Sequence, residues 1–188
     1  PHNDLSDDKF LALNGYEMEI EEENVNPVYL KACHLCYIAL SPDNLKQVCY
    51  HRTKYLYVNS PKYRHLIQYD TAKADFERKY SPECINEMIK EGRDNGFFVT
   101  YNHPQWSLES LDEYGKYHGM NAMEICNYSS VREGFDDYNE KPADGFDLRV
   151  EGYLPLQEMI IITRLCLIRQ ILLVHLRLST QKNSNIAL

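Results

Sequence analysis

The chain has 188 residues, enough for one ordinary domain, and its 44% hydrophobic content is enough to form a core. Its formal net charge of -8 argues against nucleic acid as the main partner, because that binding depends on clustered Lys and Arg, and we expect no contact with duplex nucleic acid. The start, PHNDLSDDKF, lacks an initiator Met and the basic and hydrophobic regions of a signal peptide, so we expect an internal fragment or a processed form. We predict a cytoplasmic protein, because the cysteines described below favour a reducing compartment.

The first clear strand pattern is GYEMEI, residues 15–20, in which apolar and acidic side chains alternate. The acidic run continues through residues 21–23, and we interpret Glu19 and residues 21–23 as a solvated edge. Glu17 directly follows Gly-Tyr at the start of the strand. We therefore expect Glu17 to be the acidic residue that faces inward.

Residues 29–40, YLKACHLCYIAL, form a nearly continuous apolar run, which is typical of a strand buried on both faces. His34 lies near its middle, and the residues alone allow either a hydrogen-bonded core histidine or a metal ligand. Cys33 and Cys36 have the spacing of half a zinc or redox site, but no second pair follows at a useful distance. We expect buried, reduced thiols and a reducing compartment.

Residues 41–80 hold two prolines, scattered tyrosines and several Lys and Arg, with weak helical periodicity only near 66–76. We interpret this part as an insertion that caps the rim of the sheet. A helix then begins after Ser81, a suitable N-cap with Pro82 at the first helical position, and ends at the glycines near residues 92–96.

The helix is followed by a buried strand, FFVTY at 97–101, a second helical pattern at 108–117 and another strand at 120–127. This alternation predicts parallel strands joined by helical crossovers, and such sheets carry their chemistry at the C-terminal ends of the strands. His103 and Glu124 lie at those ends.

The segments GYE, CHLCYIAL, NHPQWS and GMNAMEICN, in this order, resemble the PHP (polymerase and histidinol phosphatase) family of metal-dependent phosphoesterases. The resemblance covers roughly residues 1–149. It implies an α/β fold, a distorted (β/α)7 TIM-like barrel, which is partial here because the N-terminal strands are missing. It also implies a cluster of two or three zinc, manganese or iron ions at the C-terminal ends of the strands.

Carried over by position, the resemblance assigns Glu17, His34 and His103 as metal ligands, with Glu17 bridging two ions. It places Glu124 near the site, while Asn102 would support the ligands and Trp106 would shape the substrate entrance. The implied activity is hydrolysis of a phosphate ester by metal-activated water, with a small phosphorylated compound or a nucleotide as substrate.

The family's first His-x-His strand, its later Asp-His pair and its final Asp-x-His motif are all absent. Three ligands are too few to hold a cluster of metals firmly, and we therefore expect this chain to be weakly active or inactive. The alternative is a non-catalytic binding module with a PHP-like fold.

Residues 150–188 form an atypical tail. Beyond Tyr153 there is no Phe, Trp, Tyr or Asp, and Arg164, Arg169 and Arg177 make a membrane-spanning helix a poor interpretation. An amphipathic surface helix over residues 159–178 is one alternative. A back-translation of residues 152–163 allows LFAIAGDDNHN in a shifted frame, a strand like the one the family places there. Our hypothesis is that the tail is a frameshifted translation, which the gene sequence would test.

Overall fold

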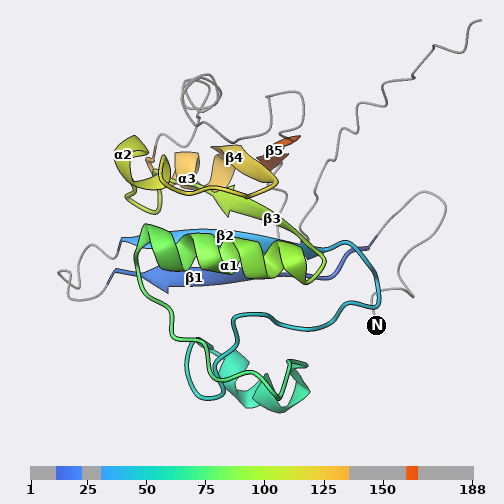
Figure 1. Cartoon of the computed structure of the whole chain (residues 1–188). Coiled ribbons are helices and arrows are strands. Elements are labelled where there is room, and N and C mark those ends of the chain that lie inside the picture. Colours follow the sequence, from blue (N-terminus) through green and yellow to red (C-terminus); the bar gives the residue numbers. More distant parts are fainter. Residues whose placement is uncertain (1–11, 23–30, 136–159, 165–188) are drawn as a thin grey trace, which may run out of the picture.

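The structure is a computed structural model that describes residues 12–22, 31–135 and 160–164. Within these ranges, five strands form one open sheet in the order β1-β2-β3-β4-β5 (Figure 1). The strands are β1 (Gly15–Glu21), β2 (Ala32–Ala39), β3 (Phe97–Asn102), β4 (Ala122–Asn127) and β5 (Ile160–Arg164). The pairs β1–β2 and β2–β3 are antiparallel, whereas the pairs β3–β4 and β4–β5 are parallel, so the sheet is mixed.

The prediction of a partial (β/α)7 barrel is wrong. The sheet is not closed in the described part of the chain, and the expected parallel order holds only from β3 onward. Between β1 and β2 lie residues 22–31, too few for the crossover of a dozen or more residues that parallel strands need. The long excursion after β2 returns to the same end of the sheet, since Ala39 pairs with Phe97, and β3 is therefore antiparallel to β2.

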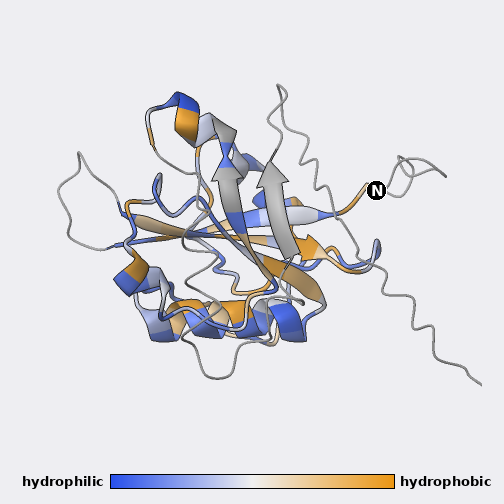
Figure 2. Ribbon diagram, turned by 90° about the horizontal axis from the view of Figure 1, so that it is seen from above, coloured by the Kyte–Doolittle hydropathy of each residue, from blue (hydrophilic) through white to orange (hydrophobic). Residues whose placement is uncertain are grey.

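The helix α1 (Pro82–Asp94) begins as predicted. The Ser81 hydroxyl accepts a hydrogen bond from the Cys84 backbone N–H at 3.3 Å, with Pro82 at the first position, and Gly96 follows the helix with φ +81°. Figure 2 shows the hydrophobic residues of α1 on the side that faces the sheet. The helix packs on β2 and β3.

The other predicted helices are shorter or absent. The pattern at 108–117 gives only the single turn α2 (Leu111–Tyr114), and no helix forms over 66–76. The excursion over residues 41–80 contains the short 3-10 helix η2 (Ser60–Leu66), which lies away from the sheet (Figure 1). A five-residue helix, α3 (Tyr128–Arg132), directly follows β4.

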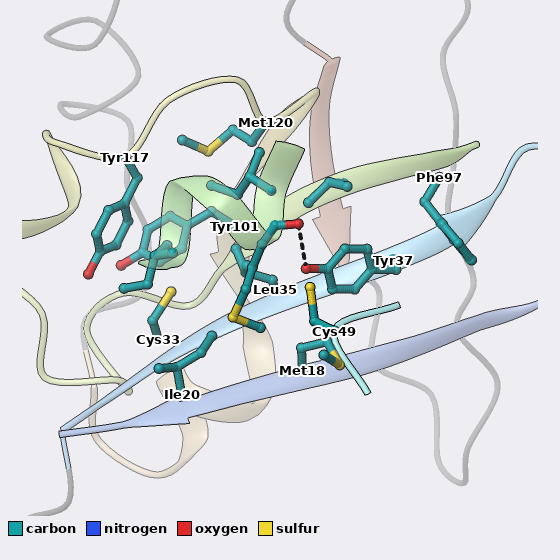
Figure 3. Packing of buried hydrophobic residues seen from close by; sticks show 14 of the residues in the cluster. Met18, Ile20, Cys33, Leu35, Tyr37, Cys49, Phe97, Tyr101, Tyr117 and Met120 are labelled. Atoms are coloured by element: carbon teal, nitrogen blue, oxygen red, sulfur yellow. Dashed lines mark hydrogen bonds between the residues drawn. The ribbon is translucent and has the colours of Figure 1, made fainter. Parts of the chain in front are cut away.

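The hydrophobic core lies between α1 and one face of the sheet (Figure 3). Met18, Leu35 and Tyr101 contribute to it from three adjacent strands. Tyr37 is also fully buried there, and its hydroxyl donates to the Met88 carbonyl of α1 at 3.1 Å. Because side chains alternate along a strand, the residues directly before and after each core residue of a strand point to the opposite face of the sheet.

That opposite face of β1, β2 and β3 is polar around His34, whereas Ile38 and Phe98 lie on it at the other end of the strands. Thr100 Oγ1 donates to Asn102 Oδ1 at 2.6 Å, and Asn102 Nδ2 donates to Cys36 Sγ at 3.4 Å. Cys33 belongs to the hydrophobic core instead, so the two cysteines of the CxxC spacing lie on opposite faces. Cys33, Cys36, Cys49 and Cys84 are buried and outside any disulfide, as expected for reduced thiols.

In the described part of the chain, no helix is long and apolar enough to cross a membrane. Of the tail over residues 150–188, the described part is β5, which pairs in parallel with β4 from Ala122–Ile160 to Asn127–Arg164. The rest of the tail, to which most of the frameshift hypothesis applies, lies outside the described residues, as does most of the N-terminal region.

Candidate metal centre

Three adjacent strands bring Glu17, His34 and His103 together. Glu17 pairs with Cys36 across β1 and β2, two residues from His34. His34 in turn pairs with Asn102 at the end of β3, and His103 is the next residue in the chain. The sheet register therefore places three residues that are distant in sequence on one polar face.

The distances within this group suit a metal ion. Glu17 Oε1 lies 3.2 Å from His34 Nδ1 and 3.3 Å from His103 Nε2. One ligand atom from each residue lies within 4.8 Å of the others. Zinc bonds of about 2.0–2.2 Å in a tetrahedral arrangement place neighbouring ligand atoms roughly 3.4 Å apart, so the two contacts of Glu17 already have the required separation.

The two imidazoles are buried, whereas the carboxylate that joins them is partly open to solvent. The His34 and His103 side chains are 9% and 8% exposed, and the Glu17 side chain is 46% exposed. Contacts with His103 and His34 outweigh burial and hold the pKa of Glu17 far below its usual value, so this carboxylate is ionised. An ion at this point would be reached from the Glu17 side.

Among the described residues, the buried Nδ1 atom of His34 has no hydrogen-bond partner. Glu17 Oε1 is 3.2 Å away, but the two groups are not oriented for a hydrogen bond. Burial lowers the pKa of His34, but Glu17 and Glu19 outweigh it and raise this pKa to about 9. The carboxylates therefore favour a positive charge at His34. A proton provides that charge in the metal-free protein, and a metal cation at Nδ1 would provide it as well.

The backbone of His103 is held in an uncommon conformation. Its φ is +30°, in the left-handed region, and its N–H donates to Glu124 Oε2 at 3.2 Å. Its imidazole Nδ1 lies 3.3 Å from the hydroxyl of the buried Ser107. These contacts turn Nε2 of His103 toward Glu17.

Trp106 covers the two histidines from one side. Its ring centroid lies 5.2 Å from that of His34 and 5.3 Å from that of His103, and its indole N–H donates to Glu133 at 3.0 Å. The indole is 37% exposed. Trp106 therefore forms a wall between the imidazoles and solvent.

Two further residues were expected near the centre, and each has its own contacts there. Glu124 is buried and reaches the His103 backbone, whereas the hydrogen bonds of Asn102 go to Thr100 and Cys36. Glu19, interpreted from sequence as a solvated edge, instead contacts His34 Nε2 at 2.9 Å. Its position two residues after Glu17 in a strand could have indicated this, because such residues share a face.

His51 is a buried histidine whose two ring nitrogens both have hydrogen-bond partners, and it provides a comparison for His34. Its Nδ1 accepts hydrogen bonds from the Thr53 and Lys54 backbone N–H groups at 3.1 and 3.2 Å, and its Nε2 lies 3.0 Å from Glu77. Both nitrogens are therefore engaged, and His51 ties two parts of the excursion together. His34 differs because its Nδ1 lacks such a partner in residues 12–22, 31–135 and 160–164.

The donor set fits one divalent transition metal ion. Two imidazole nitrogens and one carboxylate are the three protein ligands of many catalytic zinc sites, in which a fourth position stays open for water or substrate. The same set also suits iron(II) and manganese. In the described part of the chain, this is the one group of three or more His, Cys, Asp or Glu side chains with suitably placed ligand atoms.

Comparisons with models of protein families, with curated proteins and with solved structures found no match for this chain.

Proposed function

We propose that Glu17, His34 and His103 bind one divalent transition metal ion and that the centre hydrolyses phosphate esters, as the resemblance to PHP phosphoesterases implies. The observation that carries this proposal is the position of Glu17 Oε1, 3.2 and 3.3 Å from one nitrogen of each histidine, on the side open to solvent. Zinc, manganese and iron(II) all suit these donors.

A metal ion bound here would lower the pKa of a bound water from 15.7 to about 7 and polarise a phosphoryl oxygen. The protein would contribute the remaining parts of the site. Glu17 would supply one oxygen, and the buried imidazoles two nitrogens held by the sheet. Trp106 would exclude water from one side of the imidazoles, which leaves the Glu17 side for a small phosphorylated substrate.

Trp106 allows a direct test of metal binding because it is the single tryptophan of the sequence and packs against both histidines. We expect cobalt(II), nickel(II) or copper(II) to quench its fluorescence with a stoichiometry of one. His103→Ala should weaken binding at least tenfold, because one of three ligands is lost, whereas His118→Ala removes an exposed histidine and should bind as the wild type does. Equilibrium dialysis with zinc gives an independent affinity.

Hydrolysis is measured on the same variants with p-nitrophenyl phosphate and bis-p-nitrophenyl phosphate. We expect slow, metal-dependent turnover that is lost in His103→Ala and retained in His118→Ala. Stoichiometric metal binding without turnover would overturn the hydrolase proposal and support a non-catalytic binding module. Absence of metal binding in the wild-type protein would overturn the metal centre itself.

A further inference from the structure

Glu19 lies directly opposite His34 in the antiparallel pair of β1 and β2. Directly paired residues project on the same face of a sheet, close enough for their side chains to interact. Glu19 Oε2 lies 2.9 Å from His34 Nε2, a normal hydrogen-bond distance, and the Glu19 side chain is 30% exposed. This contact is on the far side of the imidazole from the group formed by Glu17 and His103.

The chemistry of this contact determines which nitrogen of His34 is available. An ionised carboxylate only accepts hydrogen bonds, so His34 Nε2 must carry the hydrogen that Glu19 accepts. When the imidazole is neutral, Nδ1 then holds the lone pair. Nδ1 is the buried atom that has no hydrogen-bond partner within the part of the chain that the structure describes, and it lies 3.2 Å from Glu17 Oε1.

We propose that Glu19 is a positioning residue of the metal centre, which holds the Nε2–H of His34 and so directs Nδ1, rather than Nε2, to the ion. This inference rests on the proposed metal site. The carboxylate–histidine–metal arrangement is common because the carboxylate orients the ring and increases the basicity of the ligand nitrogen. Glu19 would act through His34 and would not itself touch the ion.

His103 is oriented by a different contact and in the opposite sense. Ser107 is 3.3 Å from its Nδ1, which leaves Nε2 for the ion, 3.3 Å from Glu17 Oε1. The rings of His34 and His103 meet edge to face, with centroids 4.8 Å apart and an interplanar angle of 81°. The two histidines thus turn different nitrogens to the same carboxylate oxygen, each because a neighbouring side chain engages the other nitrogen.

Long-range ¹H–¹⁵N NMR of the full chain tests this inference directly, because it distinguishes protonated, unprotonated and metal-bound imidazole nitrogens. With zinc, we expect His34 to be bound through Nδ1 with a hydrogen on Nε2, and His103 through Nε2. In the metal-free protein above the pKa of His34, the hydrogen should remain on Nε2. Zinc bound at Nε2 of His34, or a hydrogen on Nδ1 in the metal-free neutral ring, would overturn the inference.

Zinc affinity, measured by competition with a chromophoric chelator, gives the second readout. We expect Glu19→Ala to weaken binding about 10- to 100-fold, as loss of a ligand-orienting group does, and Glu19→Gln to weaken it less, because the amide oxygen still accepts from Nε2. Glu87→Gln, an equal change of charge on the exposed side of α1, should leave the affinity unchanged. Circular dichroism of the metal-free variants verifies the fold.

These measurements separate failure of the inference from failure of the proposed function. If the wild type binds zinc, His34→Ala abolishes binding and Glu19→Ala binds as tightly as the wild type, Glu19 has no positioning role although the centre exists. If the wild type binds no zinc, the proposed metal centre is wrong, and the role of Glu19 is wrong as well.

Discussion

At the scale of single residues, the loop that carries His103 is anchored by a buried carboxylate. Glu109 is 3% exposed, and its backbone N–H donates to the Pro104 carbonyl at 3.0 Å. Its carboxylate accepts hydrogen bonds from the hydroxyls of Tyr80, Tyr101 and Tyr117. Three donors from different parts of the chain thus hold the loop a few residues after the candidate ligand.

Burial raises the pKa of Glu109 above its usual value, and the three tyrosine hydroxyls reduce this effect without cancelling it. Protonated Glu109 therefore contributes stability that is fully present below the ordinary carboxyl pKa and is lost as the pH rises through the raised pKa of the folded state. Glu109→Gln does not titrate at this position. We predict that the free energy of unfolding of the wild type, relative to Glu109→Gln, falls as the pH rises through this window.

Urea unfolding of both proteins between about pH 4 and pH 8 measures this difference, and each unit of raised pKa corresponds to about 1.4 kcal/mol. The exposed Glu87→Gln controls for loss of a carboxyl group and should show no comparable trend. A difference between wild type and Glu109→Gln that is constant with pH, or that grows as the pH rises, would contradict the prediction.

At the scale of elements, the fit of α1 on the sheet depends on a glycine. A Cβ atom at Gly92 would lie 2.1 Å from Tyr37 Cε1 and 2.8 Å from Val99 Cγ2. Tyr37 has little freedom to move, because it is fully buried and its hydroxyl is bonded to the Met88 carbonyl of α1. At Gly92 the helix therefore lies too close to Tyr37 of β2 and Val99 of β3 to leave room for a side chain.

We predict that Gly92→Ala destabilises the protein by about 1–2 kcal/mol net. Overpacking a core costs about 1–3 kcal/mol, and the 2.1 Å approach to a ring with little freedom to move places this site in the upper part of that range. The gain in helix propensity offsets about 1 kcal/mol of the cost. Denaturant unfolding measures the net effect. Glu87→Ala changes an exposed position of the same helix and should alter stability by no more than about 0.5 kcal/mol. Equal stability of Gly92→Ala and the wild type would show that the helix can shift away from Tyr37.

At the scale of the whole molecule, the sheet has two faces with different roles. One face is apolar and covered by α1, and the other holds the polar group of Glu17, His34 and His103. In the described residues β1 lies at one edge of the sheet. A metal ion bound to this group would link the edge strand to β2 and to the loop after β3, which makes it a crosslink across three segments.

We predict that zinc raises the melting temperature of the protein in a concentration-dependent way, since an ion that binds only the folded state stabilises it by RT ln(1 + [L]/Kd). This amounts to about 2.7 kcal/mol at a concentration 100 times Kd. Differential scanning fluorimetry with zinc and with EDTA measures the shift. His103→Ala should lose the zinc-dependent shift, whereas His118→Ala should keep it. An equal shift in His103→Ala would place the binding elsewhere.

Local sequence patterns predicted β1, β2 and α1 correctly. Alternation along residues 15–20, the apolar run around His34 and the Ser81-Pro82 start of α1 each depend on neighbouring side chains, and the corresponding elements are present. Helical periodicity at 108–117 was misleading, because tertiary contacts, including the bonds of Tyr117 and Tyr101 to Glu109, hold most of that segment outside a helix.

The sequence by itself determined the first four strands, the main helix and the residue types able to bind a metal, because these properties depend on side-chain chemistry and short-range periodicity. It did not predict β5, which lies in the segment interpreted as an atypical tail. The tertiary structure decided the direction of β3 relative to β2, the open form of the sheet and the role of Glu19 beside His34. The reason is physical: strand pairing and register join residues far apart in the chain, and no local pattern records which end of the sheet a long excursion returns to.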